Sequence, residues 1–158
     1  MNVLSSIISA AVIGIIVAAA AKSDDAAGIR TLTPESLPTP YKNRFSHGKV
    51  IPAGAKWLIT AGQTGLNKDG QPGDDIEEQA DLAMKNLHNI VQEAGMDADD
   101  VVKMTIYYLD PVYLPIIVAA RNRHFGVDFR PASTAVGVSA LARPQLLVEV
   151  ELIAARMP

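Results

Sequence analysis

The feature that most constrains the fold is an apolar–acidic alternation near the end of the chain. Along a β-strand, residues i and i+2 point to the same face, about 7 Å apart. Val148, Val150 and Leu152 would therefore share one face, and Glu149 and Glu151 the other. Because burying unpaired carboxylates is costly, this strand requires a sheet with one covered apolar face. On its other face the carboxylates are solvated, paired or used in chemistry.

The middle of the chain alternates between helical and strand patterns. Apolar residues recur at steps of three and four after Asp75 and stop at Gly95, which predicts a first helix. β-branched and aromatic residues predict a strand from Val101 to Leu109. A second helix is expected after Asp110-Pro111, with Pro115 in its first turn, where no N–H donor is lost.

Further strands are expected on both sides of these elements. They span Arg44 to Val50, Lys56 to Ala61, and Arg130 to Val136. The order strand, strand, helix, strand, helix, strand, strand predicts an α+β fold, with two helices packed on one face of a mixed sheet. The predicted central strand also has apolar residues on its second face, and no further helix remains to cover them. Self-association is the simplest cover.

Composition limits the classes of function. The chain has 158 residues, which suits one domain, and a net charge of −3. This mild acidity, together with the lack of an aromatic and basic stripe, argues against nucleic acid as a partner. There are no cysteines, and His47, His88 and His124 have no metal-like spacing. We therefore expect neither a metal ion nor a cofactor.

The first residues form a separate region. Residues 1–21 are almost wholly apolar from Val3 onward and end in four alanines, which predicts an export signal with small-residue cleavage sites. The run is also close to the length that spans a bilayer. A retained membrane anchor, and a helix folded against a partner, are the alternatives. The protein would be exported or periplasmic if the leader is cleaved, and membrane-anchored or cytoplasmic otherwise. Residues 22–43 have the composition of a linker and N-terminal extension, leaving 44–158 as the domain.

The domain carries a series of short motifs in a fixed order. They are Ile59 to Gly65, Asp100 to Ile106, Pro131-Ala132-Ser133-Thr134, Leu141-Ala142-Arg143-Pro144 and Glu149-Val150-Glu151. Together they resemble the RidA/YjgF family of small imine and enamine deaminases, over roughly Thr31 to Ala154. The resemblance implies a homotrimer with small-molecule clefts between subunits.

Three positions depart from the deaminating members of that family. There, the residue after Pro-Ala is an arginine that holds the substrate carboxylate, whereas this chain has Ser133. A serine cannot supply the planar, charged, bidentate fork that a carboxylate prefers. Arg130 lies three residues earlier, so in a continuous strand it faces the other side. The family tyrosine aligns with Phe45 and its helix asparagine with Val118.

Transferred position by position, the resemblance implies a complete candidate site. Glu149 is the expected catalytic residue, because it aligns with the glutamate that orients a water. Phe45, Gly62, Ser133 and Thr134 are the expected substrate-binding residues. Backbone donors near Gly62 could hold an anion or a carbonyl, since glycine permits close approach, and the two hydroxyls could donate hydrogen bonds.

The carboxylates and hydroxyls of this strand pair also have a purely structural explanation. The carboxylates of Glu149 and Glu151 could form a solvated strand face, or salt bridges with Arg143 or Arg156. The hydroxyls after Pro131 could be ordinary strand hydroxyls that bond to neighbours.

Surface positions are expected for the other conspicuous polar groups. Arg121 and Arg123 are predicted on the exposed face of the second helix, and His88 beside the apolar stripe of the first.

Two classes of function remain open at this level. The first is a hydrolytic deaminase of reactive enamines or imines, or a related C–N hydrolase whose substrate is altered because Ser133 replaces the arginine. The second is a non-catalytic trimer that binds a small metabolite or acts like a chaperone.

Overall fold

The computed structural model describes residues 28–158. The apolar run at residues 1–21 lies outside this part, so its role as a leader or anchor stays a prediction. Across the described part, no helix combines the length and apolar character needed to cross a membrane.

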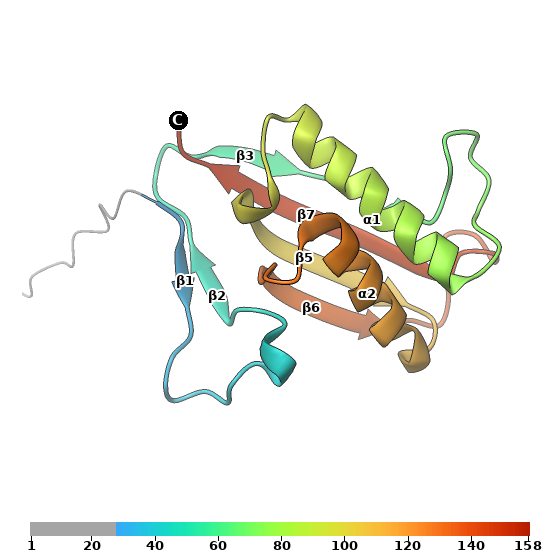
Figure 1. Ribbon diagram of the computed structural model, residues 1–158, viewed down its shortest axis with the longest axis horizontal. Coiled ribbons are helices and arrows are strands. Elements are labelled where there is room, and N and C mark those ends of the chain that lie inside the picture. Colours follow the sequence, from blue (N-terminus) through green and yellow to red (C-terminus); the bar gives the residue numbers. More distant parts are fainter. Residues whose placement is uncertain (1–27) are drawn as a thin grey trace, which may run out of the picture.

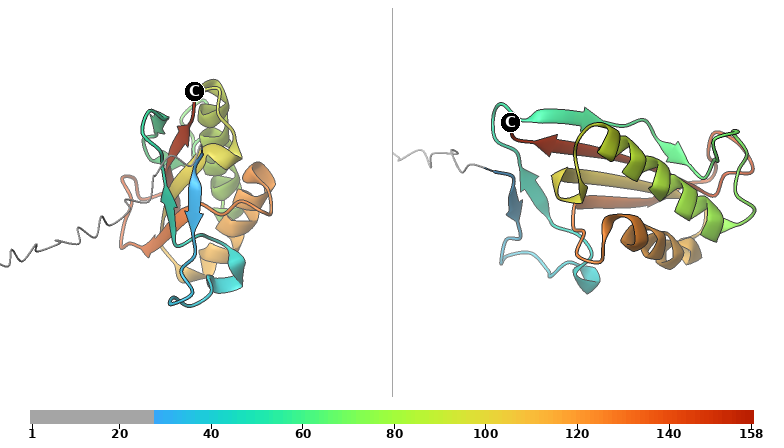
Figure 2. Two further views of the ribbon diagram at one scale, coloured as in Figure 1. Left: turned by 90° about the vertical axis from the view of Figure 1, so that its left-hand side faces the viewer. Right: turned by 45° about the horizontal axis from the view of Figure 1, so that its top comes forward.

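The main sheet is mixed and has five strands. They are β3 (Lys56–Ile59), β4 (Gln63–Thr64), β5 (Val101–Tyr108), β6 (Ala132–Gly137) and β7 (Val148–Arg156). The order is β3-β7-β5-β6, and β4 pairs with the other half of β7. Only β5 and β6 are parallel, because α2 (Leu114–Phe125) connects them as a crossover. The helices α1 (Ile76–Glu93) and α2 both cover one face (Figures 1 and 2). The predicted α+β fold is therefore confirmed.

The first helix begins and ends as the sequence predicts. The side chain of Asp75 accepts a hydrogen bond from the Glu78 backbone N–H at 2.9 Å and caps the helix. At the other end, Gly95 has a φ of +72°, the left-handed conformation that glycine adopts without strain. Between these ends the apolar stripe is buried against the sheet and α2; it consists of Ile76, Ala80, Ala83, Met84, Leu87 and Val91.

The second helix follows a short 3₁₀ turn, η3 (Pro111–Tyr113), capped by the side chain of Asp110. Pro115 lies in the first turn of α2, as expected. The prediction that Arg121 lies on the exposed face of this helix is wrong, because the residue is only 3% exposed. Arg123 is exposed as predicted and pairs with Asp81 on α1 at 2.8 Å.

A second, two-stranded sheet lies beyond one end of the main sheet (Figure 1). It pairs β1 (Arg30–Leu32) with β2 (Gly48–Val50) in antiparallel register. The first of these strands falls in segment 22–43, whose composition suggested a linker and extension. The connection includes η1 (Tyr41–Asn43), and the backbone N–H of Ser46 donates to the Pro131 carbonyl at 3.1 Å. This bond fixes the connection beside the start of β6. The remaining 3₁₀ turn, η2 (Ala98–Asp100), precedes β5.

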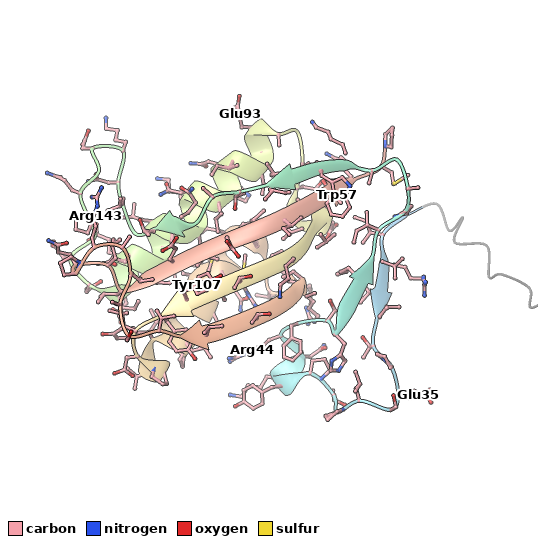
Figure 3. The ribbon with its side chains drawn as sticks, turned by 180° about the vertical axis from the view of Figure 1, so that it is seen from behind. Glu35, Arg44, Trp57, Glu93, Tyr107 and Arg143 are labelled. Carbon is pink, nitrogen blue, oxygen red and sulfur yellow. The ribbon has the colours of Figure 1, made fainter. Side chains whose placement is uncertain are left out.

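The two faces of the main sheet differ in chemistry. Val148, Val150 and Leu152 of β7 are buried under the helices, which confirms the alternation predicted for this strand. Figure 3 shows the face that no helix covers, where Tyr107 and Trp57 are labelled. Trp57 and its neighbour on β3, Ile59, are 52% and 74% exposed. The open face therefore combines polar groups on β5 and β7 with an apolar patch on β3, defined here as Trp57 and Ile59.

Candidate functional site

Two of the predicted binding residues, Phe45 and Ser133, line one cavity. It has a volume of about 180 Å³ and lies between β6, α2 and the connection that contains η1. Its lining residues are Tyr41, Arg44, Phe45, Ile106, Leu114, Val118, Arg121, Ser133 and Ala135. We call this space the α2 cavity. Its walls are mostly apolar, with two arginines, one serine and one phenol as polar groups.

The register of the sheet explains why Ser133 reaches this cavity. Ser133 pairs with Met104 in the parallel ladder between β6 and β5, and Met104 is fully buried under the helices. Neighbouring residues in register point to the same face. The Ser133 side chain therefore lies on the helix-covered face, where its hydroxyl bonds weakly to the Pro131 carbonyl at 3.5 Å.

Thr134, by contrast, lies on the open face. It is exposed, and its hydroxyl accepts a hydrogen bond from the Lys103 ammonium group. Because successive strand residues alternate between faces, the two hydroxyls cannot act on one ligand within a single cavity. The predicted hydroxyl pair is thus divided by the strand.

Glu149 and Gly62 are brought into close contact at the opposite end of β7 from the chain terminus. Glu149 pairs with Thr64 of β4 on one side and with Tyr107 of β5 on the other. A β-carbon added to Gly62 would lie 2.8 Å from the Glu149 carboxyl carbon, closer than side chains tolerate. Glycine at position 62 is therefore what leaves room for this carboxylate.

The Glu149 carboxylate has no hydrogen bond or ion pair among residues 28–158. Glu151 differs, because it accepts a hydrogen bond from the Tyr107 hydroxyl at 3.3 Å. Burial first, and then the charge of Glu151, raises the pKa of Tyr107 and keeps the phenol protonated as a donor. The suggested salt bridges to arginine do not form: Arg156 pairs with Asp97 at 3.3 Å, and Arg143 bonds to the Gly70 carbonyl at 3.5 Å.

The residues that sequence reasoning missed are Arg121 and Arg44. The terminal nitrogen Nη1 of Arg121 donates to the Arg44 carbonyl at 3.1 Å, and Nη2 donates to the Asn122 side chain at 3.1 Å. The signal was present, because Arg121 continues the helical spacing of Ile117 and Phe125 on the buried stripe of α2. The charge of its side chain, which favours an exposed position, outweighs this spacing in the prediction.

Arg130, the arginine three residues before Ser133, lies elsewhere. It lines a separate cavity of about 330 Å³ between the two sheets, and pairs with Asp128 at 3.3 Å. This cavity does not include Ser133. Among the described residues, no group of three or more histidine, aspartate or glutamate side chains is arranged to hold a metal ion.

Comparison with known proteins identifies the family. Residues 38–156 match the family described as Endoribonuclease L-PSP. This range includes most of the residues that the structure describes. The chain belongs to the RidA/YjgF family. The RutC-family protein YjgH of Escherichia coli K12 is 37% identical over 86 residues, 54% of this chain and 66% of that relative.

Two further RidA/YjgF relatives are matched over almost their whole length. The 2-iminobutanoate/2-iminopropanoate deaminase of Escherichia coli K12 is 30% identical over 134 residues, covering 80% of this chain and 98% of the enzyme. The crystal structure of the Rid-family protein YyfB from Yersinia pestis has a TM-score of 0.72 at 30% identity. It covers 81% of this chain and 98% of that one. These relatives support a general RidA-like role.

Proposed function

We propose that this protein hydrolyses the C=N bond of small imines, or of the enamines with which they equilibrate. Water adds to the imine carbon, the C–N bond breaks, and the products are a carbonyl compound and ammonia. The 30% identity to an iminobutanoate deaminase over 98% of that enzyme supports this reaction class. In our proposal Glu149 orients the water and accepts its proton.

The observation that carries this proposal is the state of the Glu149 carboxylate. It is half-buried against Gly62 and has no hydrogen-bond partner in the described chain. A carboxylate that is partly removed from water normally gains hydrogen bonds or an ion pair within the fold. Its free oxygens are suited to a water molecule and a substrate nitrogen.

The site we propose is completed by a second copy of the chain. Glu149 lies on the open face of the sheet, whereas Ser133 and the α2 cavity lie on the covered face. One subunit therefore cannot bring them to the same ligand. A homotrimer that covers the apolar patch of Trp57 and Ile59 would allow Glu149 of one copy to approach the α2 cavity of its neighbour.

The proposed substrate is a small molecule and not RNA, although the matched family description mentions an endoribonuclease. The exposed sheet face carries two carboxylates, Glu149 and Glu151, and the chain has a net charge of −3. Such a surface repels a phosphate backbone. If residues 1–21 act as an export signal, this chemistry takes place outside the cytoplasm; that location is part of the proposal.

An imine-trapping assay tests the proposal. An amino-acid oxidase generates 2-iminobutanoate from 2-aminobutanoate, and semicarbazide traps the free imine while this protein competes for it. We expect the wild-type protein to lower the trapping rate, and Glu149→Gln to lower its activity about a hundredfold or more. Glu151→Gln is the matched control, because residue 151 lies on the same face of the same strand. Equal losses in both variants would contradict the role of Glu149.

The second candidate function is a non-catalytic trimer that binds a small metabolite. The observation that favours it is Ser133, which stands where deaminating relatives have the arginine that holds the substrate. In that case, a small carboxylate would raise the thermal midpoint of the wild-type protein, while no imine would be consumed.

A further inference from the structure

The Arg121 side chain is a buried cation without a counterion. The residue is 3% exposed, and no carboxylate of the described residues forms an ion pair with it. The charges of Arg44 and Arg130, which act on this group, have the same sign. Burial and these two charges lower the pKa of Arg121 to about 10, so the group remains a cation at neutral pH. A buried charge normally has a partner, because isolated burial is costly.

The guanidinium also has hydrogen-bonding capacity to spare. It has five N–H donors, and three of them are used: Nε and Nη2 donate to the Asn122 side chain, and Nη1 donates to the Arg44 carbonyl. One hydrogen on each terminal nitrogen is left. A hydrogen bond from a charged guanidinium to a carboxylate is about twice as strong as one between neutral groups. The bonds to Asn122 and Arg44, with the ring of Phe129 at 5.7 Å, hold the planar group in position.

The α2 cavity beside this guanidinium has the chemistry of an anion site. Both charged residues in its lining, Arg44 and Arg121, are arginines, and none of the lining residues is acidic. The apolar groups, among them Leu114 and Val118, suit a short carbon chain. Ser133 and Tyr41 add hydroxyls. The volume of about 180 Å³ limits the occupant to a few carbon atoms.

We propose that Arg121 binds the carboxylate of a small 2-imino or 2-oxo acid, and so supplies from α2 the guanidinium that Ser133 lacks on β6. Arg44 adds positive charge at the same cavity, and its carbonyl fixes the orientation of the Arg121 side chain. The choice of a 2-imino acid rests on the proposed function. The anion site itself rests only on the uncompensated guanidinium and the cavity beside it.

Equilibrium binding tests this inference without turnover. The probe is 2-oxobutanoate, the product expected from 2-iminobutanoate, titrated into full-length protein by calorimetry at constant ionic strength. We expect the wild-type protein to bind it, and Arg121→Met to bind it about tenfold or more weakly, because charge-assisted hydrogen bonds are lost. Methyl 2-oxobutanoate, which keeps the ketone and lacks the charge, should bind the wild-type protein no better than it binds the variant.

Arg123→Met is the matched control. It removes the same side chain two residues away on α2, where Arg123 is exposed and pairs with Asp81. Its affinity for 2-oxobutanoate should equal that of the wild-type protein. If Arg121→Met does not fold, Arg121→Gln replaces it, since its amide can still donate to the Arg44 carbonyl. Wild-type affinity in these Arg121 variants, or an equal loss in Arg123→Met, would overturn the inference.

A rescue variant separates an anion-binding role from a purely structural one. Ser133→Arg in the Arg121→Met background supplies a guanidinium to the same cavity from β6. Recovery of 2-oxobutanoate binding is expected, whereas a structural role of Arg121 would not be restored from position 133. Arg121-dependent binding without imine hydrolysis would uphold the anion site and reject the proposed reaction. Imine hydrolysis that is unaffected by Arg121→Met would uphold the proposed reaction and reject the anion site at Arg121.

Discussion

Gly62, which directly precedes β4, lies against Glu149, near the start of β7. The two are so close that a β-carbon at position 62 would lie 3.0 Å from Glu149 Cγ. Glu149 and Gly62, which lies in the loop after β3, are 87 residues apart in the chain (149 minus 62). The position of the Glu149 side chain thus depends on the absence of a side chain at position 62.

Gly62→Ala is expected to displace the Glu149 carboxylate. The added methyl group must push the carboxyl away, so activity in the imine-trapping assay should fall at least about tenfold. The free energy of unfolding should fall by about 1–3 kcal/mol, the usual cost of overpacking. Urea denaturation and the trapping assay measure the two effects. Gly48→Ala is the control, because its nearest side-chain atom is 3.7 Å away; the two variants should not behave alike.

Replacing Gln79 should destabilise the fold, although its side chain is not in direct contact with either proposed site. This buried amide donates to the carbonyls of Gly73 at 3.0 Å and Gln145 at 2.9 Å, and accepts from the Leu147 backbone at 2.9 Å. Gln79→Leu leaves these groups unsatisfied, and we expect a loss of about 3 kcal/mol. Chemical denaturation provides the measurement. Gln92→Leu, on the exposed side of α1, should change stability by less than about 0.5 kcal/mol.

Gly65→Ala should be more harmful than its small size suggests. A β-carbon at position 65 would lie 2.6 Å from Gln79 Cγ and would also overlap the backbone of α1. A helix backbone is less flexible than a side chain and cannot move one atom at a time. The whole start of α1 must therefore shift to make room for the methyl group. A loss of about 3 kcal/mol or more in urea denaturation is expected. A variant as stable as the wild-type protein would contradict this packing.

The contribution of Asp81 to stability should depend on pH. Burial acts to raise the pKa of this carboxyl, but hydrogen bonds from Arg123 at 2.8 Å and His124 at 3.0 Å outweigh it and lower the pKa below its ordinary value. A lowered pKa in the folded state stabilises the protein above the unfolded pKa of about 3.9, and this gain is lost as pH falls through the folded value.

Asp81→Asn measures this dependence. At pH 7 the variant should be less stable than the wild-type protein by about 1 kcal/mol or less, because the pair is partly exposed. As the pH falls through the lowered folded pKa of Asp81, the difference should shrink toward zero. A difference that grows as the pH falls below the unfolded pKa of the carboxyl would have the wrong sign for a paired carboxylate. Urea melts of both proteins across this range supply the values.

Charge on the apolar patch should prevent the proposed self-association. Ile59 is 74% exposed on β3 and lies opposite Ile153 on the open face. We expect sedimentation velocity to give a trimer for the wild-type protein and a smaller species for Ile59→Glu, since a carboxylate at a covered face lacks a partner. Val127→Glu, at a site with the same 74% exposure away from this sheet face, should retain the wild-type mass.

The alternation in β7 and the helical stripe of α1 could be predicted because each depends on a local period. A strand that buries Val148 and Val150 must expose Glu149, wherever the strand is located. The same reasoning failed for Arg121, because charge was given more weight than position. Its spacing from Ile117 and Phe125 placed it on the buried face, and only packing against Phe129 and Arg44 allows a cation there.

Periodicity, turn chemistry and motif order are enough to predict the fold class, the caps of α1, the acidic strand face and the family to which the chain belongs. Which predicted site residues share a space becomes clear only in the folded chain. The fold places Ser133 on one face of the sheet and Thr134 and Glu149 on the other. It also brings Arg121 and Arg44 to the cavity beside Ser133. The physical reason is that register and packing between distant segments set these distances, and no local pattern in a chain encodes them.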